Sequence, residues 1–391
     1  MPSAPLILVL NAGSSSLKLA AFSGDHLVLR AGVERTNQTP DQRRLWIVDP
    51  EGQAIEHGPV PTIDSSSLLQ AVIDTLVTLC PGQRISAVGH RVVHGGDRFT
   101  APVRVTPDVL VELESLTPLA PLHQPHNVGE IRTALRILPD VPQVACFDTA
   151  FHATMPWKER MLGLPRKYYQ QGVKRYGFHG ISYESIASRL PAIDPRAAVG
   201  RTVVCHLGSG ASLCALRGGK SIATTMSFTP LDGLLMSTRA GAIDAGVILH
   251  LLRHEQLSPD QIEHLLDRES GLLGVSGISS DLRDLLASPA PEAAEAVDLF
   301  CYRVVRDIGA MTSALGGLDA IVFTAGIGEN SPDVRERVCS QLAWLGIEFD
   351  SAANLAGSTT LHSPLSRVSV LRIPTDEEAV IAQQTTLALV D

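Results

Sequence analysis

Aromatic residues are scarce in this chain. Phe, Trp and Tyr make up only 4% of its 391 residues. Proteins that bind single-stranded nucleic acid commonly stack the bases on aromatic rings, so this scarcity argues against such a surface. The chain also has no run of basic residues, and its net charge is −9. The positive surface of a nucleic-acid-binding protein is therefore missing as well, and we expect no nucleic acid among the partners.

Long apolar runs and closely spaced cysteines are also lacking. No apolar stretch reaches the ~18 residues of a membrane-spanning helix, and no basic region precedes the first apolar run, as it does in a signal peptide. The six cysteines are scattered and form no Cys-x-x-Cys pair. This spacing favours small core residues in a reducing compartment over a disulfide framework or a zinc site. We therefore expect a cytoplasmic protein with no membrane partner.

The overall composition of the chain is typical of a globular protein. Hydrophobic residues make up 45% and charged residues 19%, which allows large cores, and the length predicts two or three domains. Strand-like and helix-like segments alternate, which predicts α/β layers in two units divided near residue 150. The expected strands are 6–10, 17–22, 26–32, 45–49, 86–94, 141–147, a hairpin at 202–216, 320–323 and 368–373, and the expected helices are 67–80, 106–116, 127–138, 183–189, 245–253, 259–268, 291–315, 332–345 and 377–389.

The first hairpin carries the most informative motif. An apolar strand at residues 6–10 runs into the turn Asn-Ala-Gly-Ser-Ser-Ser at residues 11–16, and a second strand then carries Lys18. Small residues allow backbone N–H groups and hydroxyls to approach an anion closely, and Lys18 adds a positive charge. The segment is typical of a phosphate-binding hairpin, although the Walker A pattern G-x-x-x-x-G-K-[ST] appears nowhere in the chain.

A second segment follows the same plan about half a chain away. Residues 202–216 contain an apolar strand, a polar residue, a Gly-Ser turn and a second strand. A single Gly-Ser turn is as compatible with an ordinary β-hairpin as with a phosphate-binding turn. Two similar copies at this spacing favour a duplicated domain whose halves hold one ligand between them.

Four further clusters follow expected strands or lie on loops, where α/β sheets usually place their sites. Arg91 lies between glycines in residues 89–96, either as an ion-paired residue at a sheet edge or as a planar fork for a carboxylate or phosphate. His90 and His94 have no third ligand at suitable spacing, which disfavours a metal. Asp148 closes an apolar strand, either as a helix N-cap or as a carboxylate that faces the site.

His179 and Arg239 lie in the other two clusters. Glycines flank His179 within residues 175–182, so it is either a structural histidine or a donor to a phosphoryl oxygen. Arg239 stands among small residues on a loop, which suits a positive clamp over phosphates. Two arginines, a histidine, a lysine and an aspartate on Gly-rich turns are what phosphoryl transfer needs, because that reaction requires mainly positive charge around the moving group.

At this point the motifs resemble, in the same order, those of the acetate kinase family. The resemblance covers essentially the whole chain, through residues 10–18, 89–96, 121–123, 147–152, 176–182, 206–212, 238–239, 279–283, 323–330 and 374–378. It implies an α/β fold of duplicated ribonuclease H-like domains of the actin/Hsc70 type, with mixed β-sheets, flanking helices and a nucleotide cleft between the domains. The implied N-terminal domain is 1–150, with a closing helix at about 377–391 packed back on it. The C-terminal domain, 151–376, would bind nucleotide and form a homodimer.

The resemblance also implies a reaction, the reversible, Mg²⁺-dependent transfer of the γ-phosphoryl group of ATP to acetate, which gives ADP and acetyl phosphate. Mn²⁺ would substitute for Mg²⁺. By motif, the catalytic residues are Asp148, His179, Arg239 and Arg91. The acetate-binding residues are Arg91 for the carboxylate, Val93, Leu122, Phe178 and Pro230 around the methyl group, and His123 nearby. The nucleotide-binding residues are Lys18, His206, Leu207, Gly208, Ser209, Gly210, Asp281, Leu282, Arg283, Gly326, Ile327, Gly328, Glu329 and Asn330. The Mg²⁺ ligands are Asn11 and Glu377.

Two places depart from the family pattern. Ser209 stands where the family usually has Asn, which leaves the nucleotide preference open. Residues 240–245 read Ala-Gly-Ala-Ile-Asp-Ala, where the family usually has Ser-Gly-Asp and then Asp-Pro, so we expect the loop that presents Arg239 to be set differently. Propionate or butyrate kinase of the same family stays an alternative, and a nucleotide-dependent binding protein of the actin/Hsc70 superfamily is a more distant one.

Overall fold

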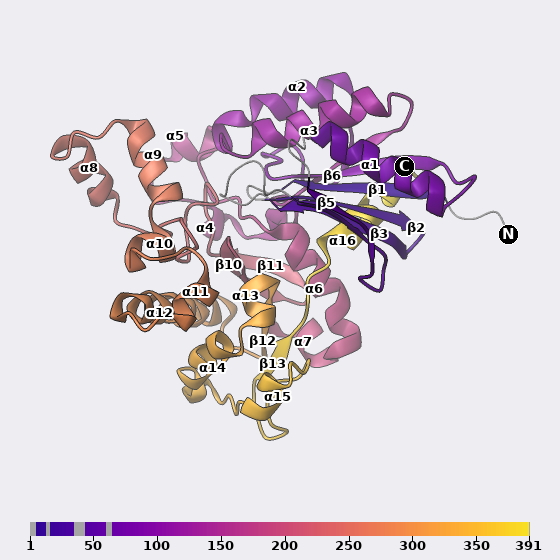
Figure 1. Ribbon diagram of the computed structural model, residues 1–391. Helices are drawn as coiled ribbons and strands as arrows, with labels where there is room; N and C mark the ends of the chain where they lie inside the picture. The colour runs from indigo at the N-terminus through magenta and orange to yellow at the C-terminus, as the bar shows by residue number, and fades with distance from the viewer. Residues whose placement is uncertain (1–4, 13–15, 35–43, 60–64, 391) are drawn as a thin grey trace. The chain divides into compact units, whose positions relative to one another are not determined.

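The structure is a computed structural model that describes residues 5–12, 16–34, 44–59 and 65–390. The chain forms two compact units (Figure 1). Unit 1 contains Met1–Ala150 and Asp376–Asp391, and unit 2 contains Phe151–Thr375. The turn at positions 13–15 of the first hairpin lies outside the described residues.

Unit 1 is built on a mixed sheet of eight strands. The strands are β1 (Leu6–Ala12), β2 (Ser16–Ser23), β3 (His26–Glu34), β4 (Arg44–Val48), β5 (Ala54–Pro59), β6 (Ile85–Val92), β7 (Val103–Arg104) and β8 (Gln143–Phe147). Their order is β5-β4-β3-β2-β1-β6-β8-β7. β1 pairs antiparallel with β2 and parallel with β6, and β6 pairs parallel with β8.

Helices cover both faces of this sheet. They are α1 (Ser65–Leu79), α2 (Pro107–Ser115), α3 (Gln124–Ile137) and α16 (Glu377–Leu387), the last drawn in yellow in Figure 1. Successive residues of a strand point to opposite faces. Val88 accordingly packs in the core that α1 contributes to, whereas the next residue, Gly89, lies against Ile381 and Thr385 of α16. All of β1 is buried between the two layers.

Unit 2 is built on a mixed sheet of five strands. They are β9 (Arg201–Leu207), β10 (Ala211–Arg217), β11 (Lys220–Thr224), β12 (Ala320–Thr324) and β13 (Ser369–Arg372). Their order is β11-β10-β9-β12-β13. β9, β10 and β11 pair antiparallel, and β9, β12 and β13 pair parallel.

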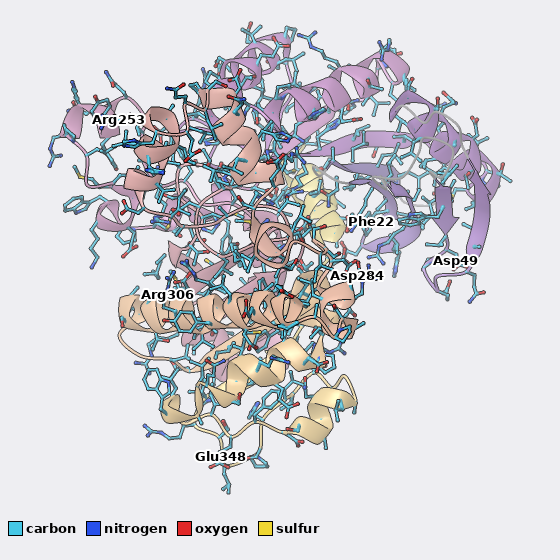
Figure 2. The ribbon with its side chains drawn as sticks, turned by 60° about the vertical axis from the view of Figure 1, so that its left-hand side comes forward. Phe22, Asp49, Arg253, Asp284, Arg306 and Glu348 are labelled. Carbon is cyan, nitrogen blue, oxygen red and sulfur yellow. The ribbon has the colours of Figure 1, made fainter. Side chains whose placement is uncertain are left out.

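Twelve α-helices are described in unit 2. They are α4 (Trp157–Arg160), α5 (Arg166–Gln170), α6 (Gly180–Ile193), α7 (Pro195–Val199), α8 (Ala245–Arg253), α9 (Pro259–Arg268), α10 (Gly271–Ser276), α11 (Leu282–Ala287), α12 (Pro291–Leu315), α13 (Ala325–Asn330), α14 (Pro332–Ser340) and α15 (Ser351–Leu355). The longest, α12, packs along β9, β10 and β11, and Figure 2 labels Arg306 on it. It begins with a proline, which lacks the N–H that a first turn leaves unpaired, and stops at Gly316, whose φ of 71° suits glycine.

The two sheets repeat one plan. The order β3-β2-β1-β6-β8 in unit 1 corresponds strand for strand to β11-β10-β9-β12-β13 in unit 2, with antiparallel pairs first and parallel pairs after. β4, β5 and β7 are additions to unit 1. The fold class expected from the sequence, an α/β protein with duplicated mixed sheets and flanking helices, is confirmed.

Several elements differ in detail from the sequence-based expectation. The helix expected at 332–345 ends at Ser340 and is followed by a 3₁₀ turn, Ala343–Leu345, because Leu342 is drawn into the core. Positions 325–330, for which no element was expected, form the short helix α13. β5, β7 and β11 were not expected; all three are short strands at the edge of a sheet.

The six cysteines are free thiols, and five of them are buried. Burial raises the pKa of the Cys214 and Cys301 thiols to about 12, so these groups stay protonated and behave as small core residues. Among the described residues, no helix is both long and apolar enough to cross a membrane.

We expect Gly89→Ala to destabilise unit 1. A Cβ atom at position 89 would lie 2.2 Å from Oγ1 of Thr385 and 2.7 Å from Cγ2 of Ile381, so α16 would have to move away from the sheet. Overpacking of this kind lowers the free energy of unfolding by about 1–3 kcal/mol, which urea unfolding would measure. Gly129→Ala on α3 is the matched control, because nothing lies within 4 Å of a Cβ there. Equal stabilities of the two variants would contradict the packing described here.

Candidate active site

The carboxyl ends of the parallel strands gather polar residues in unit 1. The parallel register places Asn11, on β1, beside Arg91, on β6, and Asp148 comes directly after β8. Parallel strands end at the same edge of a sheet, where α/β proteins commonly bind ligands. Glu377 and Glu378 reach the same place from the first turn of α16. We call these five residues the Arg91 cluster.

A buried ion pair forms the centre of the Arg91 cluster. Nη2 of Arg91 lies 2.7 Å from Oδ2 of Asp148, and Nε lies 3.2 Å from both carboxylate oxygens. The Asp148 side chain is only 2% exposed and the Arg91 side chain 14%. Burial by itself lowers the pKa of Arg91, but the charges of Asp148 and Glu377 outweigh it and raise the pKa above its usual value. Because β6 lies between β1 and β8, this pair does not belong to a sheet edge.

Asn11 connects the ion pair to two further carboxylates. Its Nδ2 donates to Oε2 of Glu377 at 3.0 Å and to Oε1 of Glu378 at 2.9 Å, while Nη1 of Arg91 donates to its Oδ1 at 3.4 Å. Amide and carboxylate oxygens are the ligands that Mg²⁺ prefers. In the part of the chain that the structure describes, no three His, Cys, Asp or Glu side chains form a metal centre. Asn11 and Glu377 therefore suit an ion that takes most of its ligands from water and phosphate.

His90 and His94 are core residues. His90 is buried and lies 2.7 Å from Oε1 of Gln143, and Nδ1 of His94 accepts from the backbone N–H of Gly96 at 2.9 Å. Burial lowers the pKa of each histidine to about 4. Both are therefore neutral at physiological pH.

The side chains expected around the acetate methyl group come from both units. In unit 1, Val93 is buried, Leu122 is half-buried, and His123 directly precedes α3. In unit 2, Phe178 is buried and Pro230 is half-buried. Their use in one acceptor pocket stays a prediction.

In unit 2, the residues expected to contact the phosphoryl group gather around Gly210. His179 has φ 58°, a left-handed conformation that stores strain in a non-glycine residue and is common at functional sites. Its Nδ1 lies 2.8 Å from Oγ of Ser212, and its ring stacks on that of His206 with centroids 4.1 Å apart. A Cβ atom at Gly210 would lie 3.3 Å from Nε2 of His179 and 2.7 Å from Nη2 of Arg239. We call these five residues the His179 cluster.

The loop that carries Arg239 is held firmly although residues 240–245 depart from the expected pattern. Nη1 of Arg239 donates to the carbonyl oxygen of Pro230 at 2.6 Å. Gly271 has φ 66°, and a Cβ atom there would lie 2.2 Å from the carbonyl oxygen of Met236. Only glycine allows this close approach, so α10 packs directly on the backbone of the loop.

The turn between β9 and β10 is the second copy of the hairpin motif. The N–H of Gly208 donates to the carbonyl oxygen of Gly210 at 3.0 Å. Leu207 is fully buried and offers a ligand only its backbone, whereas Ser209 is exposed. The carbonyl oxygen of Ser209 accepts from the N–H of Ser237 at 3.2 Å, which ties the turn to the Arg239 loop.

Glu329 braces α13. Its Oε1 accepts from the N–H of Ala325 at 2.7 Å and from the N–H of Thr375 at 3.0 Å. Ala325 has φ 64°, a second strained non-glycine residue. Nη1 of the buried Arg335 donates to the carbonyl oxygens of Gly328 and Glu329, each at 2.9 Å. The nucleotide contacts expected of α13 stay a prediction for Gly326, Ile327, Gly328, Glu329 and Asn330.

The remaining residues expected to bind nucleotide differ in exposure. Oδ1 of Asp281 caps α11 by accepting from the N–H of Arg283 at 2.9 Å, and Oδ2 pairs with Nη2 of Arg283 at 2.6 Å. The hydrogen bond from Arg283 lowers the pKa of Asp281. Leu282 is buried, whereas Arg283 and, in unit 1, Lys18 are exposed.

The model of the acetokinase family matches residues 6–383. The chain belongs to the acetokinase family. Acetate kinase of Rhodopseudomonas palustris is 50% identical to it over 388 residues and 97% of each chain, and that of Methylocella silvestris is 46% identical over 399 residues and 98% of each chain. A solved propionate kinase from Francisella tularensis has a TM-score of 0.90 at 34% identity, covering 98% of this chain and 99% of that one. The acetate kinase of Porphyromonas gingivalis has a TM-score of 0.85 at 36% identity, covering 99% and 100%.

Membership of the acetokinase family confirms the resemblance that the motifs indicated. Sequence reasoning nevertheless missed four residues of the two clusters and their surroundings. Glu378 was signalled by the acidic doublet at the start of α16, and Ser212 by its place at the end of the second hairpin motif. The buried residues Arg335 and Tyr183 had no signal in the sequence, because their side-chain partners, Asn354 and Ser212, lie 19 and 29 positions away along the chain.

We expect Gly210→Ala to slow the phosphotransferase reaction with little loss of stability. The added methyl group would push Nη2 of Arg239 and Nε2 of His179 out of place, and a displacement of about 1 Å in a catalytic group can cost ~10²-fold in rate. The measurement is kcat, with the melting temperature followed in parallel. Gly309→Ala is the control, because a Cβ there meets nothing within 4 Å. Full activity of Gly210→Ala would contradict the assignment of the His179 cluster.

Proposed function

We propose that the chain transfers the γ-phosphoryl group of ATP to acetate, reversibly and by direct in-line attack. The observation that carries this proposal is the state of the Arg91 guanidinium. Nε and Nη2 are fixed by Asp148, while the third nitrogen, Nη1, has among the described residues only the 3.4 Å contact with Asn11. A charged guanidinium held in this way can donate Nη1–H to an incoming carboxylate. The acetokinase relatives at 46–50% identity, which are acetate kinases, support the choice of acetate.

The chemistry needs little from the protein beyond charge and position. Acetate is ionised at neutral pH, so its oxygen attacks phosphorus without a general base. Asp148 accordingly orients Arg91 and takes no proton from the acceptor. Charge accumulates on the phosphoryl oxygens during transfer, and Arg239 and His179 of the His179 cluster donate hydrogen bonds to them. Turnover requires that the phosphoryl group held by this cluster reaches the carboxylate held by Arg91.

Mg²⁺ is the metal that the available ligands fit best. Asn11 and Glu377, assisted by Glu378, would hold it through oxygen atoms and intervening waters. When bound with ATP, the ion neutralises phosphate charge, and Mn²⁺ has a similar preference for such ligands. Glu378 also shares the amide of Asn11, so it keeps that side chain in place when Glu377 turns to the ion.

The nucleotide is assigned to unit 2. The turn at 206–210 and Lys18 of unit 1 would contact the phosphates, and the segments at 281–283 and 326–330 would contact adenosine. Glycine in the turn and at Gly326 leaves backbone N–H groups accessible to anions. Ser209 is exposed in this turn, so its hydroxyl is accessible to a nucleotide.

Propionate is the second candidate acceptor. The solved propionate kinase from Francisella tularensis, at a TM-score of 0.90, favours it. One methylene changes binding by only ~1–3 kcal/mol, so a pocket bounded by Val93 and Leu122 would accept both acids. We expect acetate to be preferred and propionate to be used more slowly.

We further propose a homodimer formed through α8 of unit 2. This helix has no buried residue, although Val247, Leu249 and Leu252 are apolar; it lies at the outer edge of unit 2 in Figure 1, and Figure 2 labels Arg253 at its end. Exposed apolar patches of this kind mark interaction surfaces. A second copy fits because α8 carries little charge, so two such helices would not repel each other.

The free thiols suit a reducing compartment, which is why we place the reaction in the cytoplasm.

We expect Arg91→Ala and Arg239→Ala to change different kinetic constants. Loss of Arg91 removes the carboxylate contact and raises KM for acetate, while loss of Arg239 removes a contact made mainly in the transition state and lowers kcat by about 10²–10³. The assay is hydroxamate formation from carboxylate, ATP, Mg²⁺ and hydroxylamine, with acetate, propionate and butyrate side by side. Arg98→Ala, an exposed arginine of unit 1, is the control. No hydroxamate from the unaltered protein at saturating Mg²⁺ would instead favour a nucleotide-dependent binding protein.

Leu249→Glu should convert the dimer to a monomer. A carboxylate in the middle of an apolar contact would be buried without a partner, which is strongly unfavourable. Light scattering after size-exclusion chromatography measures the mass in solution. Val111→Glu replaces a more exposed apolar residue of unit 1 and should leave the mass unchanged. A monomeric unaltered protein would rule out the dimer.

A further inference from the structure

Two buried hydroxyls stand behind His179. Oγ of Ser212, on β10, lies 2.8 Å from Nδ1 of His179 and is also hydrogen-bonded to the hydroxyl of Tyr183, on α6. Tyr183 and Ser212 are both fully buried. The phosphotransferase mechanism outlined above uses His179 but assigns nothing to these two residues.

Counting hydrogen atoms gives the chain of hydrogen bonds a direction. Within the described residues, Ser212 is the only hydrogen-bond partner that the Tyr183 hydroxyl has. A buried O–H without an acceptor is costly, so Tyr183 donates to Oγ of Ser212. Ser212 has one hydrogen, and the remaining partner is Nδ1 of His179, so Ser212 donates to Nδ1. Burial also raises the pKa of Tyr183 well above its usual value, which keeps the phenol protonated as this direction requires.

We propose that Tyr183 and Ser212 are positioning residues that hold His179 as the neutral tautomer with its proton on Nε2. A neutral imidazole carries one donor and one acceptor nitrogen, and Nδ1 is used here as the acceptor. The proton on Nε2 then faces the place that Gly210 and Arg239 border. The inference rests on the proposed function, in which His179 donates to the phosphoryl group.

The backbone and the stacked ring complete the fixation of His179. The φ of 58° sets the direction in which its side chain leaves the chain, and the ring of His206 restricts the tilt of the imidazole plane. Oγ of Ser182 lies 2.8 Å from Nδ1 of His206 and donates to Thr375, so it accepts the Nδ1–H of His206 and holds the stacked ring in place. The Nε2–H donor of His179 is therefore already oriented before the phosphoryl group is transferred, which lowers the reorganisation needed in the transition state.

Nitrogen NMR tests the tautomer directly and without any turnover. In the full chain labelled with ¹⁵N-histidine, the His179 signals are assigned by their loss in His179→Gln. We expect Nδ1 to have the shift of an unprotonated ring nitrogen and Nε2 that of a protonated one. A protonated Nδ1 would overturn the proposal even if the chain proved to be an active acetate kinase.

Kinetics of Tyr183→Phe and Ser212→Ala test the consequence. We expect kcat to fall on the order of tenfold in each, less than the ~10²–10³ lost with a direct phosphoryl contact, while KM for ATP changes less than twofold. Because either change breaks the same chain, the double variant should be no slower than the slower single one. Ser212→Thr retains a hydroxyl and should recover activity relative to Ser212→Ala.

Two matched controls separate positioning from general loss of stability. Tyr176→Phe removes a buried hydroxyl that donates to the carbonyl oxygen of Gly172, and Ser369→Ala removes a buried hydroxyl at the opposite end of the unit 2 sheet. Both should keep the unaltered kcat. An unchanged kcat in Tyr183→Phe and Ser212→Ala, or a lowered kcat with no change in the His179 nitrogen shifts, would overturn the proposal.

Discussion

The parallel hydrogen-bond ladders of the two sheets determine where reactive groups can lie. In unit 1 they bring the ends of β1, β6 and β8 to one edge, and in unit 2 they do the same for β9 and β12. Asn11, Arg91 and Asp148 lie next to one another for this reason, although more than 130 positions separate the first from the last. The turn at 206–210 and α13 meet at the matching edge of unit 2, where a Cβ at Gly208 would lie 3.7 Å from Cβ of Ala325.

The two edges use charge in different ways. In unit 1, a nearly buried aspartate neutralises a buried arginine, and burying either without the other would cost several kcal/mol. In unit 2, the positive groups are held mostly by backbone oxygens: Arg239 by Pro230 and Arg335 by the last carbonyls of α13. An acidic protein with a net charge of −9 thus places positive charge locally in unit 2, where an anionic ligand would benefit from it.

Much of this arrangement was accessible from the sequence. The alternation of apolar segments with Gly-Ser turns predicted two similar α/β units, and the residue types on those turns predicted phosphoryl transfer. Three features were inaccessible because they depend on contacts between distant segments. They are the edge strands β5 and β7 of unit 1, the helical form of α13, whose Glu329 accepts from the N–H of Thr375, and the Tyr183–Ser212–His179 chain. Nothing near Tyr183 in the sequence distinguishes it from any other buried tyrosine of an amphipathic helix.

The position of α16 has a consequence for how the chain is made. Unit 1 takes its sheet from the first 150 residues and α16 from the last 16, and the packing surface around Gly89 stays uncovered until that helix arrives. Unit 2 is continuous in sequence and can complete its core during synthesis. The unit whose sheet is translated first therefore completes its packing only after all of unit 2 and then α16 have been synthesised. Removal of α16 alone would therefore expose one face of the unit 1 sheet, which is the part of the chain that is synthesised first.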